Sequence, residues 1–211
     1  MQGRISGPVP QGLTLFETMR AEPDGTIRRW PLHLARLERS CAAVGFPLNA
    51  DEANAAVANL PQGQALRVRL VVDGSGAINL THASAPEAPS EWRVAISAER
   101  LQAGDPWLGI KSSARGVYDA ARAAMPAVAD EVILLNDQGQ VCEGSITNLF
   151  LLRAGKMLTP PVACGLLPGV LRAELLASGM AREAVLMPKD LSNGRLFCGN
   201  ALRGLIPARL I

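Results

Sequence analysis

The chain has 211 residues, of which 48% are hydrophobic and 4% aromatic, and its formal net charge at pH 7 is +2. This length suffices for one large domain or two small ones with a buried core. A charge so near zero argues against nucleic acid or an anionic membrane surface as a partner. The sequence has neither a run of 18 apolar residues nor a signal-peptide core, so we expect no membrane span.

The cysteines and histidines argue against a zinc site. The four cysteines, at positions 41, 142, 164 and 198, lack CxxC or other metal-ligand spacing, and the chain has two histidines. We therefore expect no bound metal. We interpret the thiols as free, which is typical of a protein in the reducing cytoplasm.

The first half of the chain predicts strands with two helices. A strand is expected over residues 13–20, and Asp24 with Gly25 predicts a hairpin whose returning strand is 26–30. Apolar residues at helical spacing predict a helix that ends at Gly45, and Asn49 is a plausible cap for another. The expected helices cover residues 32–45 and 51–60, and the further strands cover residues 65–72, 77–81 and 92–97.

A change of composition divides the chain. Gly, Asp and Pro follow one another within residues 101–108, which predicts a boundary there. We expect an N-terminal α+β domain over residues 1–103 and a C-terminal domain over residues 104–211. Within the second domain, a helix is expected over residues 118–124 and strands over 184–187 and 196–200.

One acid stands out in the second half. Two short apolar runs, 132–135 and 146–152, are bounded by polar turns and predict neighbouring antiparallel strands. Glu143 lies between them.

A possible phosphate site follows. Pro168 and Gly169 predict the start of a helix over residues 170–177. The backbone N–H groups of Val170 and Leu171 would point out of that helix start, which suits a phosphate.

The strings EGSITNLF, TPP, GLLPGVLR and CGNALRG together resemble the class IV aminotransferase family. The resemblance runs from about Gly12 to the C-terminus and is closest to the 4-amino-4-deoxychorismate lyase-like branch. It implies a mixed α+β fold of type IV, similar to D-amino-acid aminotransferase. A small N-terminal α/β domain would precede a C-terminal β-barrel-like domain. It also implies pyridoxal 5'-phosphate as cofactor.

The resemblance assigns roles to particular residues. Lys111 matches the lysine that bonds to the cofactor's aldehyde, and Glu143 matches the acid at the ring nitrogen. Arg36 matches the phosphate arginine. The other cofactor-binding residues by this match are Val170, Leu171 and Asn200.

The reaction is less determined than the cofactor. Thr18 matches a threonine of the lyase branch that could relay a proton to the leaving fragment, which would give 4-aminobenzoate and pyruvate in the folate pathway. An amino-acid aminotransferase for branched-chain or D-amino acids is the alternative, and a weak or inactive homologue is a further one. The substrate would be a small amino-acid-like molecule, and Arg115 and Arg203 could meet its carboxylate.

The chain also departs from the family pattern. The family usually has a further stretch before its first shared strand, so we expect a shortened N-terminus and an altered pocket wall. A tyrosine often lies five residues after the lysine, where this chain has Gly116, with Tyr118 two residues later. Because class IV enzymes share pocket residues between subunits, we expect a homodimer.

Overall fold

The computed structural model describes residue 5 and residues 7–87 and 89–211. The chain divides into two compact units. The first comprises the chain up to Glu87 together with Ile110–Ala114, and the second comprises Ala88–Gly109 and Arg115–Ile211. Strand β4 (Trp92–Leu101) therefore lies in the second unit, although the predicted boundary after residue 103 placed it in the first domain. None of the described helices is long and apolar enough to cross a membrane.

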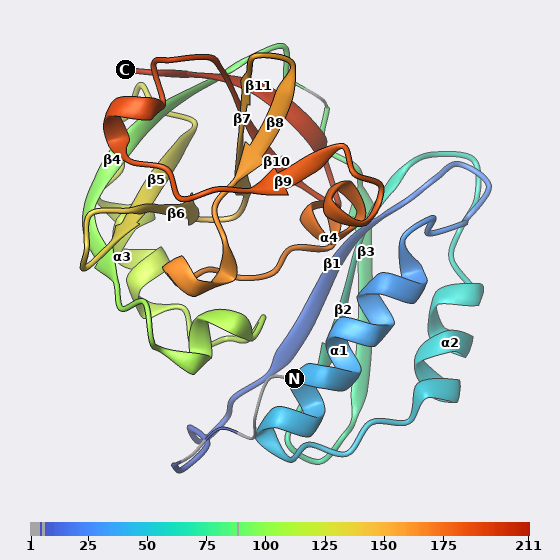
Figure 1. Cartoon of the computed structure of the whole chain (residues 1–211). Coiled ribbons are helices and arrows are strands. Elements are labelled where there is room, and N and C mark those ends of the chain that lie inside the picture. Colours follow the sequence, from blue (N-terminus) through green and yellow to red (C-terminus); the bar gives the residue numbers. More distant parts are fainter. Residues whose placement is uncertain (1–4, 6, 88) are drawn as a thin grey trace. The chain divides into compact units, whose positions relative to one another are not determined.

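The first unit is a three-stranded antiparallel sheet with two helices (Figure 1). Its strands, in the order β1-β2-β3, are β1 (Leu15–Ala21), β2 (Leu66–Val72) and β3 (Ile78–Ser84). Helix α1 (Trp30–Val44) packs on β1 and helix α2 (Ala50–Ala58) on β3, and both lie on the same face of the sheet.

Alternation along β1 sorts its side chains between the two faces. Leu15, Glu17 and Met19 are each at most 1% exposed, while Thr18 and Arg20 between and beyond them are only half-buried. Successive side chains of a strand point to opposite faces, so Leu15, Met19 and one acid, Glu17, lie on the helix-covered face, and Phe16 is buried on the other.

The predicted ends of the helices are confirmed. Gly45 closes α1 in the left-handed conformation, with φ of 79°, and its N–H donates to the carbonyl of Cys41. The side chain of Asn49 accepts hydrogen bonds from the N–H groups of Asp51 and Glu52 at the start of α2.

The second unit is built around a closed ring of strands (Figure 1). Neighbouring strands follow the order β10-β11-β4-β5-β6-β7-β8-β9, and β10 also pairs with β7, which closes the ring from β7 back to β10. Besides β4, the strands are β5 (Glu131–Asn136), β6 (Val141–Gly144), β7 (Asn148–Arg153), β8 (Lys156–Thr159), β9 (Ala181–Glu183), β10 (Arg195–Asn200) and β11 (Gly204–Leu210).

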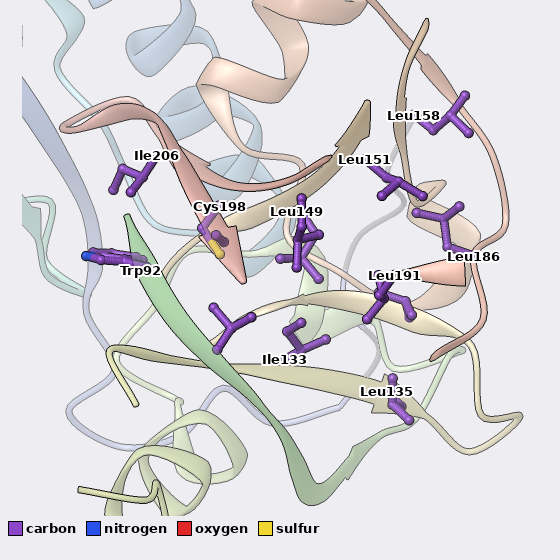
Figure 2. Packing of buried hydrophobic residues seen from close by; sticks show 14 residues of the cluster. Trp92, Ile133, Leu135, Leu149, Leu151, Leu158, Leu186, Leu191, Cys198 and Ile206 are labelled. Atoms are coloured by element: carbon purple, nitrogen blue, oxygen red, sulfur yellow. The ribbon is translucent and has the colours of Figure 1, made fainter. Parts of the chain in front are cut away.

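Apolar side chains from these strands meet in one core. Figure 2 shows Ile133 of β5, Leu149 of β7 and Cys198 of β10 side by side, and all three are fully buried. Ladder hydrogen bonds around the ring and this shared core hold the strands that carry the candidate site.

Helices cover the outside of this ring. Helix α3 (Gly116–Ala123) packs on β4 and β5, and helix α4 (Val170–Ala177) packs on β9 and β10. The short helices of the unit are η1 (Pro106–Gly109), η2 (Val162–Cys164) and η3 (Pro188–Asp190). Helix α4 has the bounds that the sequence predicts.

Three expectations about the strands are wrong, and one strand was not predicted. Residues 26–30 form a turn that leads into α1, and β1 pairs with β2 instead of a returning hairpin strand. Strand β6, which carries Glu143, lies between β5 and β7, so the two apolar runs are not neighbours. The short strand expected over 184–187 is β9, three residues earlier, and the sequence reading missed β11.

Candidate active site

The first unit holds a buried carboxylate between two basic side chains. Arg36 donates from Nε to Oε1 of Glu17 at 2.7 Å and from Nη2 to Oε2 at 2.5 Å. His33 Nδ1 lies 2.6 Å from Oε2. All three residues are at most 5% exposed. Two hydrogen bonds along one edge of a guanidinium fix its plane, so Glu17 orients Arg36.

The charge state of this cluster follows from burial and its cations. Burial alone raises the pKa of Glu17, but the Arg36 charge and the hydrogen bonds from His33 and Arg36 outweigh it and lower the pKa to about 2. Burial lowers the pKa of His33, although Glu17 opposes that shift. His33 is therefore the neutral donor, through Nδ1–H, to an ionised Glu17.

Lys111 lies beside β1 in the sheet of the first unit. Its carbonyl accepts a hydrogen bond from the N–H of Phe16 at 3.1 Å. Its Nζ lies 4.9 Å from the centroid of the Phe16 ring, and the guanidinium of Arg69 lies 3.7 Å from the same centroid. The Lys111 charge also makes a small contribution to lowering the pKa of His33.

Three predicted residues lie in the first unit, on two faces of its sheet. Thr18 is two positions from Phe16 on β1 and pairs with Arg69 across the sheet, so Thr18 shares the face on which Lys111 meets Phe16. Arg36 reaches the sheet from the helix-covered face. Sequence reasoning missed Glu17, for which an acid at a buried position of an alternating strand was the available signal.

The second unit holds Glu143, which is 4% exposed, at the end of β6. The phenol of Tyr118 donates to Oε1 at 2.7 Å, and the backbone N–H of Leu167 donates to the same oxygen at 2.9 Å. The side-chain amide of Asn148 donates to Oε2 at 3.3 Å. These donors come from a helix, a loop and a strand, and they fix the direction of the carboxylate.

The turn after Glu143 is held by a second buried acid, Glu131. Its carboxylate accepts hydrogen bonds from the N–H groups of Ser145 and Ile146 and from the hydroxyls of Ser145 and Thr147. A Cβ at Gly144 would lie 2.4 Å from Thr147 Oγ1 and 2.9 Å from Glu131 Oε2. This packing explains why glycine follows Glu143 in the sequence.

The start of α4 is close to the same carboxylate. Asn148 donates to the carbonyl of Leu167 at 2.9 Å, and its Oδ1 lies 1.9 Å from where a Cβ on Gly169 would be. Gly169 is the N-cap of α4, and no side chain caps this helix. The N–H groups of Val170 and Leu171 lie at this uncapped start, and their binding of a phosphate stays a prediction.

The turn that contains Asn200 lies beside this helix start. A Cβ on Gly199 would be 3.0 Å from Cδ2 of Leu171, so β10 and the first turn of α4 are in close contact. Asn200 itself donates to the carbonyl of Ile146 and accepts from the N–H groups of Leu202 and Arg203. These bonds use its side chain to shape the turn, and the contact of Asn200 with a phosphate stays a prediction.

The two predicted substrate arginines both have contacts inside the second unit. Arg115 donates from Nη2 to the carbonyl of Ser145 at 2.7 Å, and its guanidinium lies 5.0 Å from the Tyr118 ring centroid. The guanidinium of Arg203 lies 5.7 Å from the ring centroid of Trp92. Their contact with a substrate carboxylate stays a prediction.

The four cysteines are buried free thiols. Burial raises the pKa of Cys41 to about 11 and, with smaller contributions from neighbouring charges, those of Cys142 and Cys198 to about 12. Protonated, buried thiols are poor nucleophiles and metal ligands, so the cysteines are poor candidates for catalytic residues.

Taken separately, each unit offers groups of the kind that a cofactor with an aldehyde, a ring nitrogen and a phosphate needs. Lys111 offers an amine, Glu143 a fixed carboxylate, and the uncapped start of α4 a set of N–H donors, with Asn148 linking the last two. The position of Asn148 leaves no room for a side chain at position 169, so glycine is required there.

The sequence matches the family "Amino-transferase class IV" over residues 14–211. The chain belongs to this family. Its members depend on pyridoxal 5'-phosphate, so this protein is a pyridoxal-phosphate enzyme. The expected two-part α+β fold of type IV is confirmed.

Some similar proteins are named as aminotransferases and others as lyases. A solved structure from Mesorhizobium loti, "Putative amino-acid aminotransferase", is 39% identical with a TM-score of 0.87, covering 94% of this chain and 100% of that one. The "Putative aminodeoxychorismate lyase" of Schizosaccharomyces pombe is 28% identical over 194 residues, 85% of this chain and 81% of that protein. The "Probable branched-chain-amino-acid aminotransferase" of Thermotoga maritima is 34% identical over 85 residues, so the match spans only 31% of its length.

Proposed function

We propose that this enzyme is a 4-amino-4-deoxychorismate lyase, which eliminates pyruvate from its substrate and releases 4-aminobenzoate, a folate precursor. The observation that carries the proposal is the position of Thr18 on the sheet face where Lys111 meets Phe16. A hydroxyl near the amine that moves the substrate's α proton could pass a proton to the leaving fragment. The relative from Schizosaccharomyces pombe, matched along most of both chains, supports the same reaction.

The proposal assigns a role to each residue of the site. Lys111 bonds to the cofactor's aldehyde and, once its amine is released, takes the α proton of the substrate. Glu143 holds a proton at the ring nitrogen. Arg36, Asn200 and the N–H groups of Val170 and Leu171 bind the phosphate. When bound, the cofactor supplies an acceptor for the electron pair left by the α proton.

The buried cluster of the first unit has a supporting task. Because Glu17 takes up the Nε and Nη2 edge of Arg36, the guanidinium is held in one orientation before any anion arrives. A preorganised cation binds a phosphate with less loss of side-chain entropy than a mobile one. Glu17 is thus a positioning residue for the phosphate arginine.

A class IV aminotransferase is the second candidate. The observation that favours it is the name of the Mesorhizobium loti structure, which is more similar in sequence than the yeast relative. An aminotransferase would return the proton to the cofactor instead of expelling a fragment, and it would need a 2-oxo acid as acceptor. It has no need for the Thr18 hydroxyl as a proton donor to a leaving group.

A paired product assay tests the proposal. Enzyme with 4-amino-4-deoxychorismate should form 4-aminobenzoate and pyruvate without an added 2-oxo acid. The variant Thr18→Val, which keeps the shape but loses the hydroxyl, should lose roughly 10² in lyase turnover, and Thr18→Ser should keep most of it. Keto-acid formation that depends on an acceptor, with no 4-aminobenzoate, would establish the aminotransferase instead.

We further propose that the enzyme is a homodimer, as the class IV resemblance implies. Closed twofold dimers bury the same surface on both subunits. Light scattering over a range of concentrations, alongside specific activity, tests this. A monomer with undiminished turnover at micromolar concentration would contradict it.

A further inference from the structure

Helix α3 turns one face toward Glu143 on β6 and toward the turn that follows it. Arg115, Tyr118 and Arg122 are spaced three and four residues apart, so they share one side of the helix. Arg115 donates to the carbonyl of Ser145 and Arg122 to its hydroxyl, at 2.7 Å and 2.8 Å. Tyr118 donates to Glu143 itself. The helix thus holds the acid and the turn behind it together.

Tyr118 is a fixed donor in this arrangement. It is 8% exposed, and burial, followed by the neighbouring Glu143 charge, raises its pKa above the usual range. The phenol therefore remains protonated and donates to the carboxylate at all ordinary pH values. Leu167 N–H donates to the same oxygen, so Oε1 is occupied by two donors while Asn148 approaches Oε2.

We propose that Tyr118 is a positioning residue that keeps Glu143 ionised and oriented, so that the shared proton stays on the ring nitrogen of the cofactor. This inference rests on the assignment of Glu143 in the proposed function. It also gives a role to the tyrosine that lies two residues away from the usual family position. Tyr118 acts here through the acid and not through the cofactor's hydroxyl.

The physical reason is competition for one proton. A proton between a carboxylate and a pyridine nitrogen resides on whichever has the higher proton affinity. Each hydrogen bond donated to the carboxylate stabilises its charged form and lowers that affinity. Removing the phenol from Glu143 should therefore shift the proton from the ring nitrogen toward the carboxylate, and the ring would become a weaker electron acceptor.

The test reads the ring nitrogen directly. Enzyme loaded with cofactor carrying ¹⁵N in the pyridine ring is compared by NMR for wild type and Tyr118→Phe. The ring ¹⁵N resonance of the variant should move toward that of unprotonated pyridine. Turnover should fall roughly ten- to hundredfold, as expected for loss of a hydrogen bond to a charged group, with little change in KM.

A second arm keeps the test independent of the folding of that variant. The sequence contains one tyrosine, so 3-fluorotyrosine supplied during expression labels position 118 alone. Fluorine makes the phenol a stronger donor and leaves its size nearly unchanged. The ring ¹⁵N resonance should then move in the opposite direction, toward the fully protonated ring.

Two controls separate the possible failures. Thr159→Val removes a buried hydroxyl that donates to the carbonyl of Leu149 at 2.8 Å in the same unit, and it should leave the ¹⁵N resonance in place. Glu143→Gln should shift that resonance strongly. If the ring ¹⁵N resonance shifts in Glu143→Gln but responds neither to Tyr118→Phe nor to 3-fluorotyrosine at position 118, the role of Tyr118 alone is overturned. No shift in Glu143→Gln would overturn this inference together with the proposed role of Glu143.

Discussion

Two buried glutamates, one in each unit, are held in contrasting ways. Glu17 in the first unit accepts two hydrogen bonds from the Arg36 guanidinium and one from neutral His33. Glu143 in the second unit accepts hydrogen bonds from a phenol, an amide and a backbone N–H. Both side chains are nearly inaccessible to solvent.

The difference agrees with the two roles that we propose for these acids. A guanidinium cancels the charge of the carboxylate that it grips, so Glu17 is suited to fixing Arg36 in place. A phenol, an amide and a backbone N–H orient the Glu143 carboxylate, and in the proposed function this carboxylate faces a cationic ring nitrogen. Under the proposed function, Glu143 therefore acts on the ring nitrogen and Glu17 on the orientation of Arg36.

The largest expected effect comes from the amine that the first unit contributes. The sequence contains three lysines, and Lys156 and Lys189 are exposed to solvent. Lys111→Ala should abolish covalent trapping of the cofactor by borohydride, read by intact mass, because no other amine is placed to replace it. Lys156→Ala is the control and should trap like the wild type. A single trapped cofactor in Lys111→Ala would refute the assignment.

The next effect is a loss of stability when Glu17 is replaced. Glu17→Gln leaves the Arg36 charge buried without its carboxylate, so unfolding free energy at pH 7 should fall by about 3 kcal/mol. The folded pKa of Glu17 is lowered from its ordinary 4.5 to about 2. Its contribution is therefore fully present above pH 4.5 and is lost as the pH falls toward 2. The unfolding free energies of wild type and Glu17→Gln, measured by denaturant titration, should therefore converge as the pH is lowered from 4.5 to 2.

A surface acid provides the matched control for that titration. Glu22 is half-buried and lies 3.5 Å from Arg20 in a solvent-accessible ion pair. Glu22→Gln should change stability by no more than about 1 kcal/mol at any pH. A Glu17→Gln protein as stable as Glu22→Gln at pH 7 would show that the buried cluster is not what holds Arg36.

The smallest effect concerns the turn next to Glu143. In Gly169→Ala the new methyl would overlap Oδ1 of Asn148, which must then release Leu167 or Glu143. We expect a loss of about 1–3 kcal/mol in stability, measured by denaturant unfolding, and weaker cofactor binding. Gly116→Ala is the control, because a Cβ there meets nothing within 4 Å. Equal stability of the two variants would contradict the close approach of Asn148.

Local sequence signals predicted the helix boundaries well. Gly45 and Asn49 carry their own conformational preferences, and Pro168 with Gly169 marks the start of α4, so these ends depend little on distant contacts. Glu143 could be singled out because it stands alone between apolar runs. The family motifs assigned its role, which periodicity could not.

Features that depend on distant contacts could not be predicted. Strand β6 has four residues, too few to show a period, and its pairing with β5 and β7 makes it a strand. Residues 26–30 carry a turn signal, but β1 finds its partner in β2, more than forty residues later. The link from Tyr118 to Glu143 joins a helix to a strand 25 residues away, and no local pattern encodes it.

The ring-nitrogen ¹⁵N resonance of the bound cofactor tests the central contrast most directly. It should be measured in wild type, Glu143→Gln and Glu17→Gln. We predict a protonated ring in the wild type and in Glu17→Gln, and a resonance shifted toward unprotonated pyridine in Glu143→Gln. A shift in Glu17→Gln with none in Glu143→Gln would contradict the division of labour between the two acids.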